Sequence, residues 1–381
     1  MSSTAQGSNA APATTPRRMD HYVTLGRSGL RVSPICLGAM TFGTEWGFGV
    51  GPEESGQVLA EYLECGGNFI DTANMYTKGH SEKILGDWFA QGPGRGRRDR
   101  VVIATKFMGN MYRGDPNGGG AGRKSIMSAC EESLRRLRTD YIDLYWAHFW
   151  DRFTPLEEMM AALDALVRAG KVRYLGLSDH PGWVCATAQM LAEARHWAPV
   201  AAIQIEYSLL QRSVEWELMS MAAHFGMGVT PWSPLRGGVL SGKFSRARMP
   251  AGDGSTRVRP ESKYLNEHTW QVLDILESAA AAAGCSVAQA ALRWVMDRPG
   301  VTSTIIGART LSQLRDNLGA AWVALPAEHV ARLNELTQPP APFPWEFLDS
   351  IPRTAILNGT TVNGVRGEPW PMSPADDSER F

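Results

Sequence analysis

The sequence has no excess of charge of either sign and no long hydrophobic run. It contains 38 Lys plus Arg and 39 Asp plus Glu in 381 residues, which gives a formal net charge of −1. Nucleic-acid-binding domains are usually strongly basic, so we expect no nucleic-acid partner. No stretch of about 18 apolar residues is present to cross a bilayer, and the first twenty residues lack the apolar segment of a secretory signal. We therefore expect no membrane association and a cytoplasmic location.

Cysteine is scarce, and its spacing excludes two further classes of protein. The five cysteines are widely separated, their number is odd, and no C-x-x-C pair occurs: Cys36, Cys65, Cys130, Cys185 and Cys285. A disulfide framework and a zinc site both need closer or paired cysteines. We expect reduced, mostly buried thiols and no bound metal.

Short apolar runs alternate with segments of helical periodicity along most of the chain. Eight runs are bounded by turn residues: 35–40, 68–73, 101–107, 142–148, 172–178, 201–207, 228–233 and 301–307. Helical periodicity lies in 53–65, 81–90, 123–137, 156–169, 182–194, 216–225, 266–297 and 311–320. Strands buried on both faces and separated by helices predict a parallel sheet. Ahead of them, His21 to Ser33 reads as a β-hairpin about a Gly-Arg-Ser-Gly turn.

Eight such units predict the α/β class and a closed (β/α)8 TIM barrel, which typically needs about 250 residues. The alternative, an open doubly wound sheet, would normally show a G-x-G-x-x-G motif after its first strand. Here the first run is followed by AMTFGTEWGFG, which lacks that motif. We expect residues 1–20 to form a disordered tail, 21–338 the barrel, and the Pro- and Gly-rich segment 339–381 a loop-like extension.

Four ionisable side chains fall where barrel enzymes place their reacting groups, just past the carboxyl ends of strands. Asp71, Lys106 and His148 end three neighbouring runs, and Tyr76 follows Asp71 by five residues. Singly, each has an ordinary structural explanation, such as a loop-capping carboxylate or a surface amine. Together, they would cost several kcal/mol to desolvate at one rim unless a site uses them.

These four residues suggest proton-transfer chemistry. A nearby Lys106 ammonium favours the phenolate of Tyr76, so we expect it to lower the Tyr76 pKa. Asp71 would keep Lys106 protonated and aimed, and His148 could donate a hydrogen bond to a carbonyl oxygen or relay a proton. None of the four supplies hydride, so reduction of a carbonyl would need a nicotinamide.

The motif DTANMYTKGHSEKILG at Asp71 to Gly86, together with IATKF and the strand-ending His148, resembles the aldo-keto reductase family, in particular its aryl-alcohol-dehydrogenase-like members. The likeness runs from about Leu25 to Leu318. It implies a (β/α)8 barrel that binds NADP(H) without a Rossmann domain. It also implies that Tyr76 is the general acid of a carbonyl reductase, completed by Asp71, Lys106 and His148.

The resemblance further implies a set of cofactor residues. Ser178, Asp179 and Gln204 would address the carboxamide, and Tyr207 would stack on the nicotinamide. The pyrophosphate would be wrapped by the segment that contains Trp232, Ser233, Leu235, Gly237 and Lys243. Gly307, Arg309, Gln313 and Asn317 match the adenosine-phosphate site. Arg309 has independent support, because a cation at a helix N-terminus opposes the helix dipole and favours a bound anion.

Two features depart from the common family pattern. Asp179 stands where Asn is usual, and it could instead cap the helix that begins near Pro181. The extension after Pro340 is also longer than most members have. Aromatic residues could wall a pocket for a flat carbonyl compound or serve only as loop anchors: Phe42, Trp46, Phe48, Phe149, Trp150 and Trp345.

Two other functions stay open from the sequence. One is a nucleotide-binding regulatory subunit with little turnover, like the reductase-related subunits of potassium channels. The other is a Schiff-base barrel aldolase that uses Lys106. The expected partner is a small carbonyl or alcohol substrate, and the sequence leaves the oligomeric state open.

Overall fold

The computed structural model describes residues 18–251 and 257–380. Residue contacts divide the chain into a barrel unit, Ala13–Thr337, and a second unit that includes Gln338–Phe381. The predicted N-terminal tail lies almost wholly outside the described residues.

Eight parallel strands form one sheet in the order β10-β3-β4-β5-β6-β7-β8-β9. The strands are β3 (Ile35–Gly38), β4 (Phe69–Asp71), β5 (Val102–Phe107), β6 (Ile142–Ala147), β7 (Val172–Ser178), β8 (Val200–Glu206), β9 (Gly228–Trp232) and β10 (Thr304–Ile306). The Thr302 amide next to β10 donates to the Val229 carbonyl of β9 at 2.8 Å, so the sheet is nearly closed. The (β/α)8 fold predicted from the sequence is confirmed.

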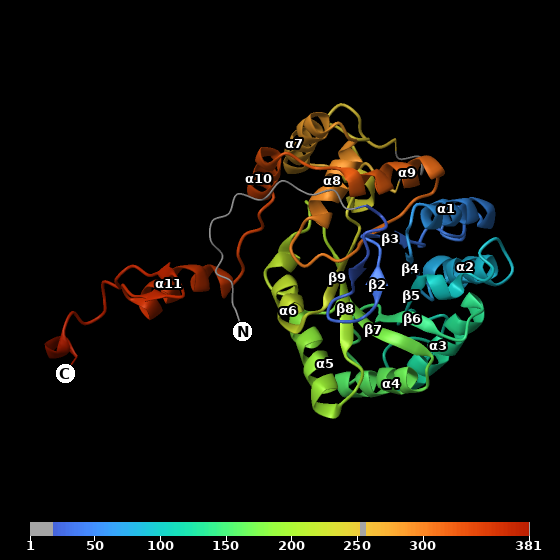
Figure 1. Cartoon of the computed structure of the whole chain (residues 1–381), viewed down its shortest axis with the longest axis horizontal. Coiled ribbons are helices and arrows are strands. Elements are labelled where there is room, and N and C mark those ends of the chain that lie inside the picture. Colours follow the sequence, from blue (N-terminus) through green and yellow to red (C-terminus); the bar gives the residue numbers. More distant parts are fainter. Residues whose placement is uncertain (1–17, 252–256, 381) are drawn as a thin grey trace. The chain divides into compact units, whose positions relative to one another are not determined.

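Helices surround the strands (Figure 1). They are α1 (Pro52–Glu64), α2 (His80–Ala90), α3 (Arg123–Leu137), α4 (Leu156–Arg168), α5 (Gly182–Arg195), α6 (Leu218–Phe225), α7 (Glu267–Ala283), α8 (Val287–Met296), α9 (Leu311–Gly319) and α10 (Ala327–Leu336). The helical region predicted over 266–297 divides because Gly284 adopts the left-handed conformation and Ser286 starts α8 with a capping box. Helix α10 was not expected from the sequence.

The N-terminal hairpin is present as predicted and packs against the barrel. Strands β1 (Val23–Thr24) and β2 (Arg31–Val32) pair antiparallel. Leu25 is fully buried in a cluster with strand residues such as Phe69 and Leu144. A Cβ at Gly26 would meet the backbone of Ala201 and Gly228 at the starts of β8 and β9. The hairpin therefore covers the amino-terminal end of the barrel.

Alternation along the strands determines what faces the barrel interior. Residues two apart point to the same side of a strand. Phe69, Ala104 and Leu144 lie in the buried interior cluster, and the next positions on their side are Asp71, Lys106 and Trp146. The large Trp146 ring fits because its neighbour on β7 is Gly176, where a Cβ would overlap the ring.

The C-terminal unit corrects one prediction. Instead of a loop-like extension, it contains α11 (Trp345–Leu357) and a hairpin of β11 (Thr361–Val362) and β12 (Val365–Arg366). Apart from Pro352 within α11 and Gly364 in the hairpin turn, the Pro and Gly residues of the segment lie outside these short elements, so average composition concealed them. In the described part of the chain no single helix is long and apolar enough to cross a membrane, whereas α7 and α8, bent by 94°, pass that test only as a pair.

We predict that Gly176→Ala destabilises the barrel, because the new methyl group would overlap the Trp146 ring. Overpacking of this kind typically costs about 1–3 kcal/mol. The measurement is urea unfolding, with Gly29→Ala as the matched control, since a Cβ at Gly29 meets no atom within 4 Å. Equal stability of the two variants would contradict this account of the interior packing.

Candidate functional site

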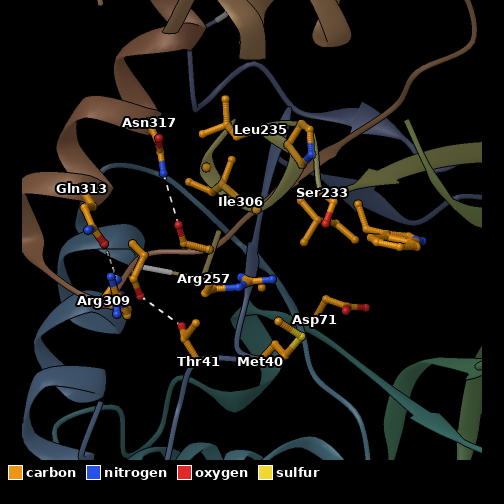
Figure 2. Close-up of a pocket in the computed structure, with 18 of the residues that line it drawn as sticks. Met40, Thr41, Asp71, Ser233, Leu235, Arg257, Ile306, Arg309, Gln313 and Asn317 are labelled. Carbon is orange, nitrogen blue, oxygen red and sulfur yellow. Dashed lines mark hydrogen bonds between the residues drawn. The ribbon is translucent and has the colours of Figure 1, made fainter. Parts of the chain in front are cut away.

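A cavity of about 540 Å³ opens at the carboxyl ends of the strands. Its lining includes most residues predicted for the site: Asp71, Tyr76, His148, Phe149, Ser178, Asp179, Gln204, Trp232, Ser233, Leu235, Gly237, Lys243, Gly307, Arg309, Gln313 and Asn317. Figure 2 shows part of this lining, with α9 contributing Gln313 and Asn317. Residues from six strand ends and from α9 thus meet in one hollow.

Lys106 lies beneath the cavity and is completely buried. Its Nζ donates to an Asp71 carboxylate oxygen, to the Thr72 carbonyl at 2.9 Å and to the Tyr76 hydroxyl at 3.1 Å. Burial by itself lowers the Lys106 pKa, but Asp71 and the Tyr76 oxygen outweigh it, and the net shift is upward. Lys106 is therefore a fixed ammonium with all three of its N–H bonds used.

Tyr76 differs from the prediction in the net direction of its pKa. Burial raises the Tyr76 pKa, the Lys106 charge lowers it, and Asp71 raises it again, so the pKa lies above its ordinary value. Lys106 acts in the predicted direction but is the smaller effect. The hydroxyl is consequently protonated at neutral pH, which suits a proton donor.

His148 is held neutral beside Tyr76. The two ring centroids are 5.7 Å apart. Burial and the Lys106 charge lower the His148 pKa to about 3. Its buried Nδ1 has no hydrogen-bond partner among the described residues. Nδ1 is closed to solvent, whereas the ring lines the cavity and Nε2 forms no hydrogen bond with the described residues, so Nε2 is the free nitrogen that can bind a polar atom of a ligand.

The turn that carries Tyr76 is strained. Thr77 and Lys78 both adopt left-handed backbone angles, which β-branched Thr rarely does. The buried Thr77 hydroxyl donates to the Phe42 carbonyl at 2.7 Å and fixes the turn against the first loop. Phe42 therefore acts through its backbone: its side chain is fully buried and does not line the cavity, contrary to the prediction.

The other predicted aromatic residues divide into three groups. Trp46 packs edge-on against Tyr76 with centroids 6.0 Å apart, and Phe48 packs against Trp46, but contrary to the prediction neither residue lines the cavity. Phe149 lines the cavity, whereas Trp150 packs against Trp183 outside the lining. Trp345 begins α11 of the C-terminal unit.

Two aromatic residues were predicted for the part of the site near β7 to β9, and only one of them lines the cavity. Tyr207 does not line the cavity: it is buried, its hydroxyl donates to Glu215 at 2.6 Å, and its ring packs against Trp294. Trp232 lines the cavity instead. Gln204 also lines it and donates through Nε2 to Asp71 at 3.0 Å.

Asp179 lies at the end of β7 and faces the cavity. Its carboxylate accepts from the Trp232 indole N–H at 3.0 Å and from the Ser178 hydroxyl at 3.4 Å. Desolvation by the surrounding protein raises the pKa of the Asp179 carboxyl to about 6, although the hydrogen bonds from Trp232 and Ser178 act in the opposite direction. Helix α5 starts at Gly182 with no side-chain cap, so the alternative role of Asp179 as a helix cap is wrong.

The segment after β9 provides backbone that a phosphate can approach. Ser233, Arg236, Gly237 and Gly238 all have positive φ. A Cβ at Gly237 or Gly238 would meet no atom within 4 Å, so both glycines border open space, and Gly237 also lines the cavity. Lys243 lines the same part. A glycine turn that borders open space beside a cation leaves room for a pyrophosphate.

The loop from β10 to α9 is held rigid around Arg309. The Gln313 side chain accepts from the Arg309 amide at 2.9 Å, and Asn317 donates to the Gly307 carbonyl at 3.2 Å. The Thr41 hydroxyl of the first loop donates to the Ala308 carbonyl at 3.2 Å. These three bonds are drawn in Figure 2.

Arg257, which was not predicted, is a second arginine in the cavity lining. In Figure 2 it lies between Arg309 and Asp71. Burial and the charge of Arg309 lower the Arg257 pKa. Neither arginine forms an ion pair with a carboxylate among the described residues. The sequence signal for Arg257 was weak, because the loop 245–263 contains Arg246, Arg248, Arg257 and Arg259 and nothing distinguishes them.

Comparison with known proteins gives a consistent result. Residues 34–338 match the model of the Aldo/keto reductase family. The chain is 39% identical to an uncharacterized oxidoreductase of Bacillus subtilis, over 83% of this chain and 95% of the relative. It is 33% identical to an aryl-alcohol dehydrogenase of Pestalotiopsis microspora, over 88% of each chain. It is 35% identical to an aryl-alcohol dehydrogenase [NADP(+)] of Phanerodontia chrysosporium, over 81% of this chain and 83% of the relative.

The neutral state of His148 predicts a pH-dependent stability. Between its folded pKa of about 3 and its ordinary value of 6.5, the unfolded chain binds a proton that the folded chain does not. The free energy of unfolding therefore rises with pH in this window because of His148. We expect His148→Asn to show a shallower rise from pH 4 to pH 6.5 than the wild type in urea unfolding. An identical slope in both would contradict the burial of a neutral imidazole, and exposed His268→Asn is the control.

Proposed function

Because the chain belongs to the aldo/keto reductase family, we propose that it reduces an aldehyde or ketone to an alcohol with NADPH and catalyses the reverse reaction with NADP+. The observation that carries this proposal is the protonated Tyr76 hydroxyl at the floor of the cavity, bonded to the buried Lys106 ammonium at 3.1 Å. The nicotinamide, when bound, supplies the hydride that these residues lack.

The described side chains would divide the remaining work. Tyr76 would donate its proton to the carbonyl oxygen, and Lys106 would stabilise the phenolate that remains. The free nitrogen of His148 would bind and orient that oxygen. Asp71, held by Gln204 at 3.0 Å, would keep Lys106 charged and in place.

The residues present fit a dinucleotide phosphate. Gly237, Gly238 and Lys243 would hold the pyrophosphate, and Ser178 and Gln204 would bind the carboxamide. Arg309 and Arg257 would neutralise the 2′-phosphate, because two adjacent guanidinium groups without carboxylate partners favour a bound anion.

The two alternative functions are less well supported. A Schiff-base aldolase needs a free amine, whereas Lys106 is buried and uses all three N–H bonds. A regulatory subunit with little turnover would not need a protonated Tyr76 beside a cavity lined by Phe149. Turnover decides between a regulator and a reductase.

The test is consumption of NADPH with a panel of aldehydes. Aromatic aldehydes are tested first, because Trp46 and Phe149 surround Tyr76 and His148 with rings and two relatives are aryl-alcohol dehydrogenases.

We predict that Tyr76→Phe lowers turnover by roughly 100-fold to 10,000-fold, the usual contribution of a general acid, while NADPH binding stays within a few-fold. Near-normal turnover of this variant would remove Tyr76 from the proton-donor role.

Arg309 provides a test of cofactor choice. We predict that Arg309→Ala weakens NADPH binding by roughly 1.5–3 kcal/mol, the scale of a hydrogen bond to a charged group, and hardly changes NADH binding. Dissociation constants for both cofactors give the answer, with Arg259→Ala as an exposed control from the neighbouring loop. Equal losses for NADPH and NADH would show that Arg309 does not contact the 2′-phosphate.

A further inference from the structure

The turn that follows Tyr76 has three consecutive residues in the left-handed region. The backbone angles φ and ψ are 46° and 44° at Thr77 and 57° and 32° at Lys78, and φ is 90° at Gly79. Glycine adopts such angles at no steric cost, whereas a β-branched residue such as Thr is poorly suited to them. The chain therefore carries strain directly beside Tyr76, and a strained residue persists only where other contacts hold it.

The side chain of Thr77 makes a contact that glycine could not make. It is fully buried, and its hydroxyl donates to the Phe42 carbonyl of the first loop at 2.7 Å. The loop backbone comes close at this point because residue 43 is a glycine: a Cβ at Gly43 would lie 2.7 Å from the Thr77 hydroxyl oxygen. The Gly43 amide also donates to the Val50 carbonyl at 2.8 Å and closes the first loop on itself. Thr77 thus ties the turn to a loop whose own backbone is held.

Further links between the first loop and this part of the chain act at a distance from Tyr76. The buried Ser81 hydroxyl donates to the Ala39 carbonyl at 2.7 Å, but Ser81 already belongs to α2. The Nδ1 of His80 lies 3.0 Å from a carboxylate oxygen of Glu45, and the His80 side chain is half exposed. Surface pairs of this kind contribute little to stability. Neither link holds the residue that directly follows Tyr76.

Small movements of this turn are magnified at the Tyr76 hydroxyl, which lies at the far end of the ring from the backbone. The hydroxyl has to remain 3.1 Å from Lys106 Nζ, while the ring centroid stays 5.7 Å from that of His148. Misplacing a reacting group by about 1 Å can lower a rate by about 100-fold. Trp46 of the first loop packs edge-on against the same ring. A contact that fixes the turn against the first loop therefore fixes both the base of the Tyr76 side chain and the ring that flanks it.

We propose that Thr77 is a positioning residue for the proton transfer. Its hydroxyl, bonded to the Phe42 carbonyl, holds the strained turn in the conformation that keeps the Tyr76 hydroxyl beside Lys106. This inference rests on the proposed function for the reaction that Tyr76 serves. It requires that turnover depends on the hydroxyl at position 77 and not on the strain or the stiffness of the turn.

The first test separates the hydroxyl from the strain. Thr77→Gly removes both, whereas Lys78→Gly relieves strain at the next, exposed residue and keeps the hydroxyl. With NADPH and an aromatic aldehyde, we expect Thr77→Gly to lower kcat by about tenfold to 100-fold, with KM within about threefold and the NADPH dissociation constant within about twofold. Lys78→Gly should keep kcat within about twofold of the wild type. The melting temperature of each variant should stay within about 3 °C of the wild type, because relief of strain offsets the bond lost in Thr77→Gly.

Thr77→Ser provides the rescue, because Ser keeps the hydroxyl that donates to the Phe42 carbonyl. We expect its kcat to lie within about threefold of the wild type. Three results would each overturn the proposal. They are a kcat of Thr77→Gly close to the wild type, a loss in Lys78→Gly as large as in Thr77→Gly, and a Thr77→Ser variant as slow as Thr77→Gly.

The second test needs neither cofactor nor substrate. In ¹⁵N-labelled protein, the indole N–H signal of Trp46 is identified by its loss in Trp46→Phe, and it reports the packing of Trp46 against the Tyr76 ring. We expect Thr77→Gly to shift or broaden this signal, and Thr77→Ser and Lys78→Gly to leave it close to the wild-type position. An unchanged signal in Thr77→Gly would show that Thr77 does not tie Tyr76 to the first loop, and it would overturn the proposal. A wild-type protein that reduces no aldehyde but gives these signals would contradict only the proposed function.

Discussion

The buried ammonium group of Lys106 is the interaction on which the candidate site depends. It is fully enclosed and contacts Asp71, the Thr72 carbonyl and the Tyr76 hydroxyl. An unpaired charge at this depth would cost several kcal/mol, so each partner must remain in place for the others to be tolerated. Since Asp71 is also bonded to Gln204, the cluster links β4, β5 and β8 to the turn that carries Tyr76.

Charge is separated along the cavity above this cluster. A carboxylate lies beside Trp232, where Asp179 accepts the indole N–H. Arg257 and Arg309 lie at the part formed by the long loop and α9. A ligand with a ring that becomes cationic on oxidation at one end and phosphates at the other complements this arrangement. The proposed binding and catalysis would therefore use one continuous pattern of charge.

Much of the fold and of the site could be predicted from the residues at the strand ends. Side chains alternate along each strand and parallel strands end at the same rim of a barrel, so Asp71, Lys106 and His148 meet there independently of the loop conformations. Ring directions beyond the strands were not predictable. Glu215, eight residues further along the chain, and Trp294 of α8 hold Tyr207 away from the cavity. The predicted direction of the Tyr76 pKa shift was also wrong. The prediction considered only the charge of Lys106, whereas burial has the largest effect on this pKa.

The most direct test of the central claim removes the buried ion pair as a unit. Asp71→Asn combined with Lys106→Met leaves no unpaired charge, so the barrel should still fold. With NADPH and an aromatic aldehyde, we expect turnover at least about 100-fold below the wild type, because Tyr76 loses the charge that stabilises its phenolate, while NADPH binding changes by only a few-fold. A folded double variant that turns over at a rate close to the wild type would contradict the account.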